Sequence, residues 1–225
     1  MTKRRIVDVH VHVFPDDLAA RAVAHLASQS GEPAFADGTA GGLLASMGKA
    51  GIEASLVQPV STKPAQTPSI NTYSSALNRW PLLSFGTLHP DFDQPFDEIE
   101  RLREAGVRGI KFHPDYQLFY VDEERMFPVY EGMAKAGLTA FFHAGVDIGL
   151  KPPYHGTPER IARVLERVPD LDVVAAHFGG FQMWEDVDRF LVGRRLWLET
   201  SFTLSYLPAA DFVRMARRHG IERVM

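Results

Sequence analysis

Hydrophobic and polar residues alternate along the first stretch of the chain, between Arg5 and Phe14. Successive side chains of a strand point to opposite faces, so the alternation predicts a strand from Ile6 to His12 with two different faces. One face consists of Val7, Val9, Val11 and Val13, and the other of Ile6, Asp8, His10 and His12. Two imidazoles on the same face suit a metal ion. An isolated His-x-His is more often a solvated, half-exposed strand, so the rest of the chain has to decide.

A second pattern recurs four times, where a helix end is followed by glycine and then by an apolar strand start. The glycines are Gly51, Gly106, Gly137 and Gly220. Glycine just past a helix takes the left-handed closing conformation readily. Between Thr157 and Pro169, apolar residues at Ile161, Val164, Leu165 and Val168 follow the i, i+3, i+4, i+7 spacing of an amphipathic helix. The chain is therefore predicted to repeat one helix-to-strand joint.

Eight segments fit buried or half-buried strands. They are Ile6 to His12, Ile52 to Gln58, Leu82 to Leu88, Val107 to His113, Leu138 to His143, Leu171 to His177, Arg195 to Thr200, and Ile221 onward. Helical patterns separate them, which predicts parallel neighbours and a single α/β domain over residues 1–225, a (β/α)8 TIM barrel. The competing doubly wound sheet would be expected to carry a glycine-rich phosphate loop, and the sequence has none.

The eighth segment is short, because Ile221 to Met225 resembles only the start of a strand. A barrel with seven strands and a stub would leave backbone groups unpaired along two edges. We therefore expect the barrel to be cut off at the start of strand 8, with its C-terminal end missing from this sequence. The alternative is a short chain whose barrel is closed by a partner's strand.

The composition indicates which kinds of molecule the protein binds. A net charge of -4 and a pI near 6.1, with scattered Lys and Arg, give no basic field for nucleic acid or an anionic membrane. A small-molecule substrate is the expected partner. The absence of cysteine leaves nitrogen and oxygen ligands for any metal. Neither a signal peptide nor a long apolar span is visible, so the predicted location is cytoplasmic.

Histidines concentrate at the ends of the proposed strands. Six of the nine lie there: His10, His12, His89, His113, His143 and His177. Histidines that only pack in a core have no reason to prefer strand ends, whereas barrel enzymes place their chemistry at that rim. Alternation puts Lys111 and His113 on the inward face of one strand. It also aims His143 inward with Phe141, and His177 inward with Ala175 and Val173.

Four motifs in this order resemble the amidohydrolase superfamily, in particular the amidohydrolase-2 group of TIM-barrel metal-dependent hydrolases, which also contains non-oxidative decarboxylases. The motifs are Asp8-Val9-His10-Val11-His12, Gly109-Ile110-Lys111-Phe112-His113-Pro114, Phe142-His143-Ala144-Gly145 and Ala176-His177-Phe178-Gly179-Gly180. The resemblance covers essentially the whole chain.

The resemblance implies a divalent metal, usually Zn²⁺, as one or two ions. Its ligands would be His10, His12 and His143, together with an aspartate from the eighth strand, whose position would follow Met225. His177 would be a second-metal ligand or an acid/base. Neutral imidazole ligands leave zinc its full charge, so a bound water would lose its proton near neutral pH.

Other candidate residues carry alternative interpretations. Lys111 is a candidate catalytic residue, either as a carbamylated metal bridge or as a cation for a substrate carboxylate, and otherwise a core lysine paired with Glu199 or Asp8. His113, Tyr116 and His89 are candidate substrate-binding residues, and otherwise ordinary polar rim residues. Asp8 would orient a histidine. The long loop from Val146 to Gly156 is a candidate lid or a plain surface loop.

The leading hypothesis is a metal-dependent hydrolase of the amidohydrolase type, acting on a small amide, lactone or ester. The first alternative is a metal-dependent non-oxidative decarboxylase, and the second is a non-catalytic ligand-binding barrel. The sequence leaves the oligomeric state open, and a homodimer is compatible with such barrels.

Overall fold

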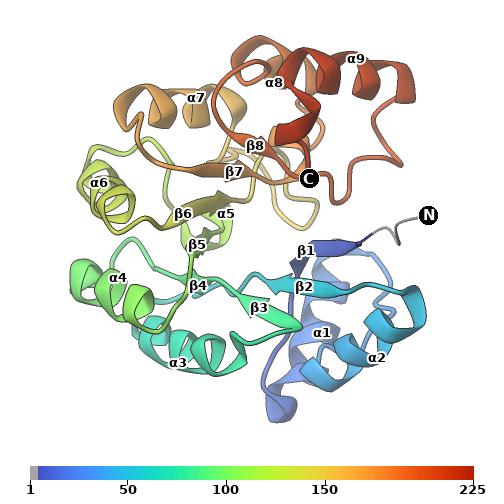
Figure 1. The fold of residues 1–225 in the computed structure, drawn as a ribbon, viewed down its shortest axis with the longest axis vertical. Helices are drawn as coiled ribbons and strands as arrows, with labels where there is room; N and C mark the ends of the chain where they lie inside the picture. Colours follow the sequence, from blue (N-terminus) through green and yellow to red (C-terminus); the bar gives the residue numbers. More distant parts are fainter. Residues whose placement is uncertain (1–4) are drawn as a thin grey trace.

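The computed structural model describes residues 5–225, and its strands run through the middle of the molecule with helices outside them (Figure 1). The strands are β1 (Val7–Val11), β2 (Ala54–Val57), β3 (Leu82–Ser84), β4 (Gly86–Thr87), β5 (Gly109–Phe112), β6 (Thr139–Phe142), β7 (Val173–Ala175) and β8 (Trp197–Leu198). The α-helices are α1 (Asp16–Ser30), α2 (Ala40–Ala50), α3 (Thr67–Leu77), α4 (Pro95–Glu104), α5 (Pro114–Gln117), α6 (Phe127–Lys135), α7 (Pro158–Arg167), α8 (Trp184–Phe190) and α9 (Ala209–His219). Short 3-10 helices are η1 (Pro64–Gln66), η2 (Glu124–Met126), η3 (His177–Gly179) and η4 (Ile221–Arg223).

The named strands pair in parallel and in chain order, as predicted for a (β/α)8 arrangement. One sheet has the order β1-β2-β3 and the other the order β4-β5-β6-β7-β8. Only Phe85 separates β3 from β4, so the predicted third strand is a single bent segment. Its first half pairs with β2 and its second half with β5. The two sheets therefore continue one another through this segment.

The predicted eighth strand is wrong over most of its length. Ile221–Arg223 forms the 3-10 helix η4, and only Val224 makes a parallel bridge, to Leu198 of β8. The N–H of Met225 also donates to the carbonyl of Leu198, at 3.0 Å. The position of the segment beside β8 agrees with the barrel order, although its backbone is largely helical.

Three of the four predicted helix-to-strand joints are present, at Gly51, Gly106 and Gly137, whereas Gly220 is followed by η4 and not by a strand. Gly51 and Gly137 close α2 and the α6 turn with φ of 71° and 68°, in the left-handed region that glycine adopts at low cost. The segment predicted as an amphipathic helix is α7, which buries Ile161, Ala162 and Val164.

Apolar side chains form two clusters on the two sides of the strands. The larger lies between the strands and the outer helices, and it contains Ile110 and Phe112 of β5 and Phe142 of β6. The smaller lies inside the ring of strands. It contains Phe85, Phe141, Val174 and Ala176, with Leu56 and Trp197 packed against it. The site histidines lie next to this inner cluster, and the ring of His10 contacts that of Phe141.

One predicted face is wrong. Val173 and Ala175 of β7 belong to the outer cluster, whereas Val174 and Ala176 point inward. Simple alternation would then send His177 outward with Val173 and Ala175. The chain leaves the strand first, because His177 has a left-handed φ of 56°, and this turn redirects the imidazole to the interior.

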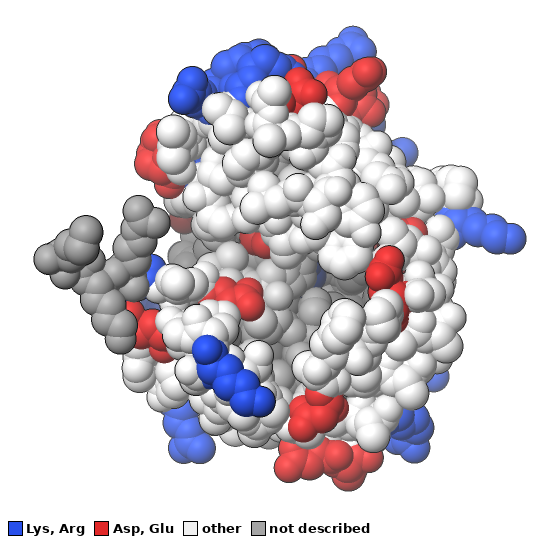
Figure 2. Space-filling model, turned by 90° about the vertical axis from the view of Figure 1, so that its right-hand side faces the viewer, with Lys and Arg blue, Asp and Glu red and all other residues white. Residues whose placement is uncertain are grey.

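On the face shown in Figure 2, charged side chains lie mainly towards the edges, and the middle is largely uncharged and hollowed. Within residues 5–225, no helix combines the length and the apolar content that a bilayer crossing requires.

Candidate functional site

His10 of β1 and His12, which directly follows the strand, point to the interior, and one nitrogen of each ring is already hydrogen-bonded. The Nδ1 of His12 donates to the backbone carbonyl of Gln58 at 2.7 Å. The Nδ1 of His10 lies 2.9 Å from Oε2 of Glu199, which accepts its proton. In a neutral imidazole, a proton on Nδ1 leaves Nε2 as a lone pair. Both rings are therefore set to offer Nε2 to a third group.

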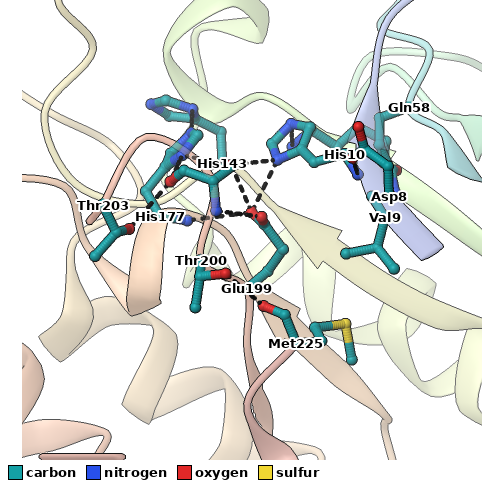
Figure 3. A network of polar contacts seen from close by, with 12 residues as sticks. Asp8, Val9, His10, Gln58, His143, His177, Glu199, Thr200, Thr203 and Met225 are labelled. Atoms are coloured by element: carbon teal, nitrogen blue, oxygen red, sulfur yellow. Dashed lines mark hydrogen bonds and ion pairs between the residues drawn. The ribbon is translucent and has the colours of Figure 1, made fainter. Parts of the chain in front are cut away.

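Glu199, which follows β8, is the centre of the polar network (Figure 3). The hydroxyl of Ser201 donates to Glu199 Oε2 at 2.8 Å and also lies 3.0 Å from His10 Nδ1. The backbone N–H groups of Ser201 and His177 donate to the same carboxylate. Burial raises the pKa of Glu199, and these hydrogen bonds oppose that effect. The carboxylate thus fixes both the ring of His10 and the backbone at His177.

His177 joins this network from η3. Its Nδ1 lies 3.1 Å from the carbonyl oxygen of Ser201, which can only accept, so Nδ1 carries the proton. Its Nε2 lies 3.1 Å from Nδ1 of His143. The rings of His177 and His10 are stacked at 5.3 Å. Left-handed backbone at His177 and at Phe178, a pair of non-glycine residues, is the kind of strain that folds maintain at functional sites.

The imidazoles are neutral in this environment. Burial, followed by the charge of Lys111, lowers the pKa of His12 to about 4 and that of His177 to about 3. The same two causes lower the pKa of His10 well below its usual value. Burial also lowers the pKa of His143 well below the usual value. Neutral imidazole is the form that binds a metal ion.

Lys111 lies under these rings. Its Nζ is 3.4 Å from Nε2 of His10 and 4.4 Å from the ring centroid of Phe141, and the side chain is buried. Burial lowers the pKa of Lys111 to about 7, against the opposing charge of Glu199. The lysine predicted as a catalytic residue therefore contacts a predicted metal ligand.

A second group of rings stands beside the first. His143, which follows β6, stacks on His113 at 4.1 Å, and His113 stacks on Tyr116 at 4.0 Å. Oδ2 of Asp147 lies 3.3 Å from Nε2 of His113 and 3.9 Å from Nε2 of His143. Burial raises the pKa of Tyr116 to about 12. The structure thus brings His113 and Tyr116 next to the predicted ligand His143.

His89 is placed differently from the other predicted site residues. Its Nδ1 accepts from the N–H of Asp91 at 3.1 Å, and the Asp91 carboxylate lies 3.9 Å from the same nitrogen. The ring therefore contacts the turn after β4 that contains it.

Asp8 also makes a local contact, because its Oδ1 accepts from the backbone N–H of His10 at 3.1 Å. It orients the strand backbone at His10, not an imidazole ring.

Three residues of the site were missed as site residues from the sequence: Glu199, Ser201 and Asp147. Glu199 had been considered only as a partner of Lys111. Its position at the end of a predicted strand, the same signal that selected the histidines, would have identified it. Asp147 and Ser201 lie on loops, where no periodic pattern indicates direction.

A cavity of about 140 Å³ opens beside His143 and His177. Its other walls are Val146, Asp147, Ile148, Phe181 and Phe202. A larger cavity of about 620 Å³ lies between α8 and α9, lined by exposed arginine–aspartate pairs and by none of the site histidines. The small apolar cavity is therefore the one that adjoins the candidate chemistry.

The residues present fit a divalent cation. Within residues 5–225, two sets of ligand atoms lie within 4.8 Å of one another: His10, His177 and Glu199, and His113, His143 and Asp147. His12 adjoins the first set, with its ring 5.2 Å from that of His10. Three Nδ1 protons are held by oxygen atoms, which leaves each Nε2 as a lone pair. The Nε2 of His10 faces Lys111 Nζ at 3.4 Å, and that of His177 faces His143 Nδ1 at 3.1 Å. This is the arrangement of histidines prepared to ligate a metal.

Comparison with solved structures shows the fold. The chain is similar to an uncharacterised TIM-barrel protein from Bordetella bronchiseptica, with 22% identity and a TM-score of 0.74 over 99% of this chain and 84% of that chain. It is similar to a 5-carboxyvanillate decarboxylase variant from Novosphingobium aromaticivorans with bound manganese, at 15% identity and a TM-score of 0.72 over 98% of this chain and 85% of that chain. A probable 2-pyrone-4,6-dicarboxylic acid hydrolase from Acinetobacter baumannii has 13% identity and a TM-score of 0.63, over 99% and 82% of the two chains.

A search of curated proteins finds no match to this sequence. A family model does match it, over residues 7–225, and that range contains every strand and every histidine described above. The order of motifs, the barrel arrangement of strands and this match agree, and the chain belongs to the amidohydrolase family.

Proposed function

We propose that this protein is a metal-dependent hydrolase that binds a divalent cation, with Zn²⁺ the first candidate, through His10, His12, His143 and His177. The observation that carries the proposal is the fixed protonation of three rings. His10, His12 and His177 each give their Nδ1 proton to an oxygen of the protein, which leaves the lone pair on Nε2, the form that ligates a metal. The substrate would be a small amide, lactone or ester.

When bound, a divalent cation would polarise the scissile carbonyl and activate the attacking water. The chain's own residues prepare the site. Glu199 and the carbonyl of Gln58 hold the two β1 rings in one orientation. Burial keeps the imidazoles neutral, as shown by the lowered pKa values of His12 and His177. His177, at the cavity wall, is proposed to act in one of two ways: as a ligand through Nε2 or, if it does not ligate, as the residue that carries a proton to the leaving group.

Lys111 has a proposed role in charge balance. Its amine lies 3.4 Å from His10 Nε2, and its lowered pKa makes the neutral form accessible near pH 7. A neutral amine is not repelled by a neighbouring cation, and a protonated amine would attract a substrate carboxylate.

His113 and Tyr116, whose rings stack beside His143, are proposed to contact the substrate. His89 stays a weaker proposal, because its ring is engaged with Asp91.

A second candidate function, non-oxidative decarboxylation, is favoured by the cavity. Val146, Ile148, Phe181 and Phe202 give the space beside His143 and His177 apolar walls. Apolar surroundings destabilise a substrate carboxylate relative to the neutral carbon dioxide that leaves it. His177 would then protonate the carbon that loses the carboxylate.

Metal binding is tested first. The wild-type protein, a His10→Ala/His12→Ala variant and a His25→Ala control would be dialysed against Zn²⁺ or Mn²⁺, and bound metal counted by mass spectrometry. His25 lies exposed on α1 and serves as a matched histidine removal. Stoichiometric metal in wild type and His25→Ala, with loss in the double variant, is the expected result. Wild-type protein without bound metal would refute the proposal. Anomalous diffraction at the zinc edge would identify the ligands.

The two reactions are separated by their products. Metal-loaded protein would be incubated with a panel of lactones and simple esters, followed by proton release, and with small aromatic carboxylic acids, followed by carbon dioxide release. Hydrolysis predicts acid from the first panel only. Carbon dioxide from the second panel, and no acid from the first, would replace hydrolysis by decarboxylation. His177→Asn should slow either reaction by about 100-fold or more, the usual size of a lost acid/base.

A further inference from the structure

We infer that Phe202 is a specificity-determining residue, whose ring forms one side of the opening of the small cavity and limits the size of the apolar group that a substrate can place there. The inference rests on the proposed function, because it concerns the substrate of the same site. Phe202 lies on the loop after β8 and lines the cavity together with His143 and His177.

The walls of this cavity differ in exposure. His143 and Phe181 are buried, whereas Ile148 is 40% exposed and Phe202 is 46% exposed. The buried side chains therefore form the inner end of the cavity, and the two half-exposed ones form its opening. A substrate group that enters the cavity from solvent passes between Ile148 and Phe202.

The ring of Phe202 is packed against two other aromatic rings. It meets the ring of Phe181 edge-on, with centroids 5.5 Å apart and an angle of 68° between the planes. It also stacks on Tyr206 at 5.5 Å with an angle of 18°, and Tyr206 meets Phe181 at 5.0 Å. Edge-on and stacked pairs of this kind are favourable, so the three rings hold one another in place. The Phe202 side of the opening is therefore fixed.

The backbone also holds Phe202 in position. Its φ of 57° is left-handed, which is uncommon for a residue other than glycine. The N–H of Thr203 donates to the carbonyl of Thr200 at 3.3 Å, and the hydroxyl of Thr203 donates to the carbonyl of Ser201 at 3.0 Å. The carbonyl of Ser201 also accepts from Nδ1 of His177 at 3.1 Å. The same turn thus sets the position of Phe202 relative to the imidazole of His177.

The volume of the cavity indicates which group fits. An apolar cavity of about 150 Å³ accommodates benzene in another protein, and the cavity here measures about 140 Å³. Its apolar walls suit a hydrocarbon group, and the reacting carbonyl would then lie towards the imidazoles. A group much larger than a single six-membered ring would have to displace Phe202 from Phe181 and Tyr206.

The first test uses two neutral probes, benzene and naphthalene, and needs no metal. Their binding to wild type, Phe202→Ala, Phe202→Asn and Leu204→Ala would be followed by NMR, through the ring-current shifts of the methyl groups of Val146 and Ile148. Leu204 is exposed on the same loop and does not line the cavity, so its truncation is the matched control. Asparagine adopts left-handed backbone more readily than most residues, so Phe202→Asn guards against a variant whose turn fails to form.

Wild type and Leu204→Ala should bind benzene, and they should bind naphthalene at least about 10-fold more weakly than the Phe202 variants do. A single extra methylene in an apolar pocket already changes selectivity by about 10- to 200-fold. Equal naphthalene affinity in wild type and in both folded Phe202 variants would overturn the inference. Wild-type protein in which benzene leaves the Val146 and Ile148 methyl signals unshifted would overturn it as well.

The second test uses metal-loaded protein with methyl benzoate and methyl naphthoate, whose hydrolysis is followed by proton release. Phe202→Ala should raise kcat/KM for the naphthoate relative to the benzoate by about 10-fold or more, and Leu204→Ala should leave the ratio unchanged. An unchanged ratio in Phe202→Ala would contradict the inference. Wild-type protein that binds no metal and hydrolyses no ester would instead refute the proposed function, and probe binding alone would then decide the role of Phe202.

Discussion

The part of the molecule that contains β1 to β3 is packed differently from the part that contains β4 to β8. In the first part, α1 buries Ala19 alone, α2 buries Met47 alone, and α3 buries Thr67, Asn71 and Ser74. In the second part, α6 buries Phe127, Val129, Tyr130 and Met133, and α7 buries Pro158, Ile161, Ala162 and Val164. The large apolar cluster consists of residues from Leu88 onward. Apolar stabilisation is therefore concentrated in the second part.

The candidate site crosses this division. His10 of β1 and His12, directly after β1, belong to the lightly packed part, and His143, His177 and Glu199 belong to the densely packed part. The contact of Glu199 with His10 joins residues 189 positions apart. The candidate ligands therefore come from two regions that differ in how many apolar side chains they bury, and a bound cation would connect these regions.

The largest expected effect is a difference between two leucine substitutions. Leu102 of α4 is fully buried, whereas Leu44 of α2 is 42% exposed. Leu102→Ala should lower the free energy of unfolding by about 2–5 kcal/mol, because it removes apolar contacts and leaves a cavity. Leu44→Ala should cost less than about 1 kcal/mol. Both sites are helical, so helix propensity is matched. Urea unfolding measures both values, and equal losses would show that the two parts are packed equally well.

The next effect is stabilisation by metal. A ligand at 100 times its dissociation constant stabilises the folded protein by about 2.7 kcal/mol. Because the proposed ligand His10 lies on β1 and the proposed ligand His12 directly follows it, Zn²⁺ should slow amide hydrogen exchange in β1 and β2, and not only in β6 and β7. His12→Ala should abolish the slowing in β1. Protection confined to residues after β4 would show that the cation does not connect the two parts.

Much of the fold could be predicted because local chemistry determines it. Apolar runs between helical patterns located the strands, and glycines such as Gly51 and Gly137 marked the joints. The last segment was mistaken because Ile221 to Met225 has an apolar strand-like composition, while its backbone closes as a 3-10 turn after Gly220. Five residues hold too little pattern to separate these outcomes.

The candidate site was predictable only in part. The ends of the predicted strands identified the imidazoles. Alternation predicted that Lys111 faces inward, where the structure places its amine beside His10. It failed at His177, because a left-handed turn ends the strand and reverses the side-chain direction. Asp147 could not be placed from sequence, since its contact with His113 depends on the course of a loop. The metal ligands, the catalytic residues and the single-domain boundary stay predictions until they are tested.

The smallest expected effect is a pH dependence in α9. His219 is fully buried, its Nδ1 accepts from the N–H of Gly193 at 3.2 Å, and its Nε2 donates to the carbonyl of Leu196 at 3.0 Å. The contact at Nδ1 requires the neutral ring, because a protonated imidazole cannot accept a hydrogen bond there. Burial lowers the pKa of His219 from its ordinary 6.5. Below pH 6.5 the unfolded chain therefore binds a proton that the folded protein does not, so stability falls as pH falls, by at most about 1.4 kcal/mol per pH unit.

Substitution isolates this contribution from that of the other buried histidines. His219→Gln keeps a donor and an acceptor but does not titrate, so its unfolding free energy should fall less than that of wild type between pH 7.5 and pH 5.5. His25→Gln changes an exposed histidine on α1, in the lightly packed part, and should follow the wild-type curve. Parallel curves for wild type and His219→Gln would mean that α9 opens to water easily. The dense packing that distinguishes the second part of the molecule would then not extend to its last helix.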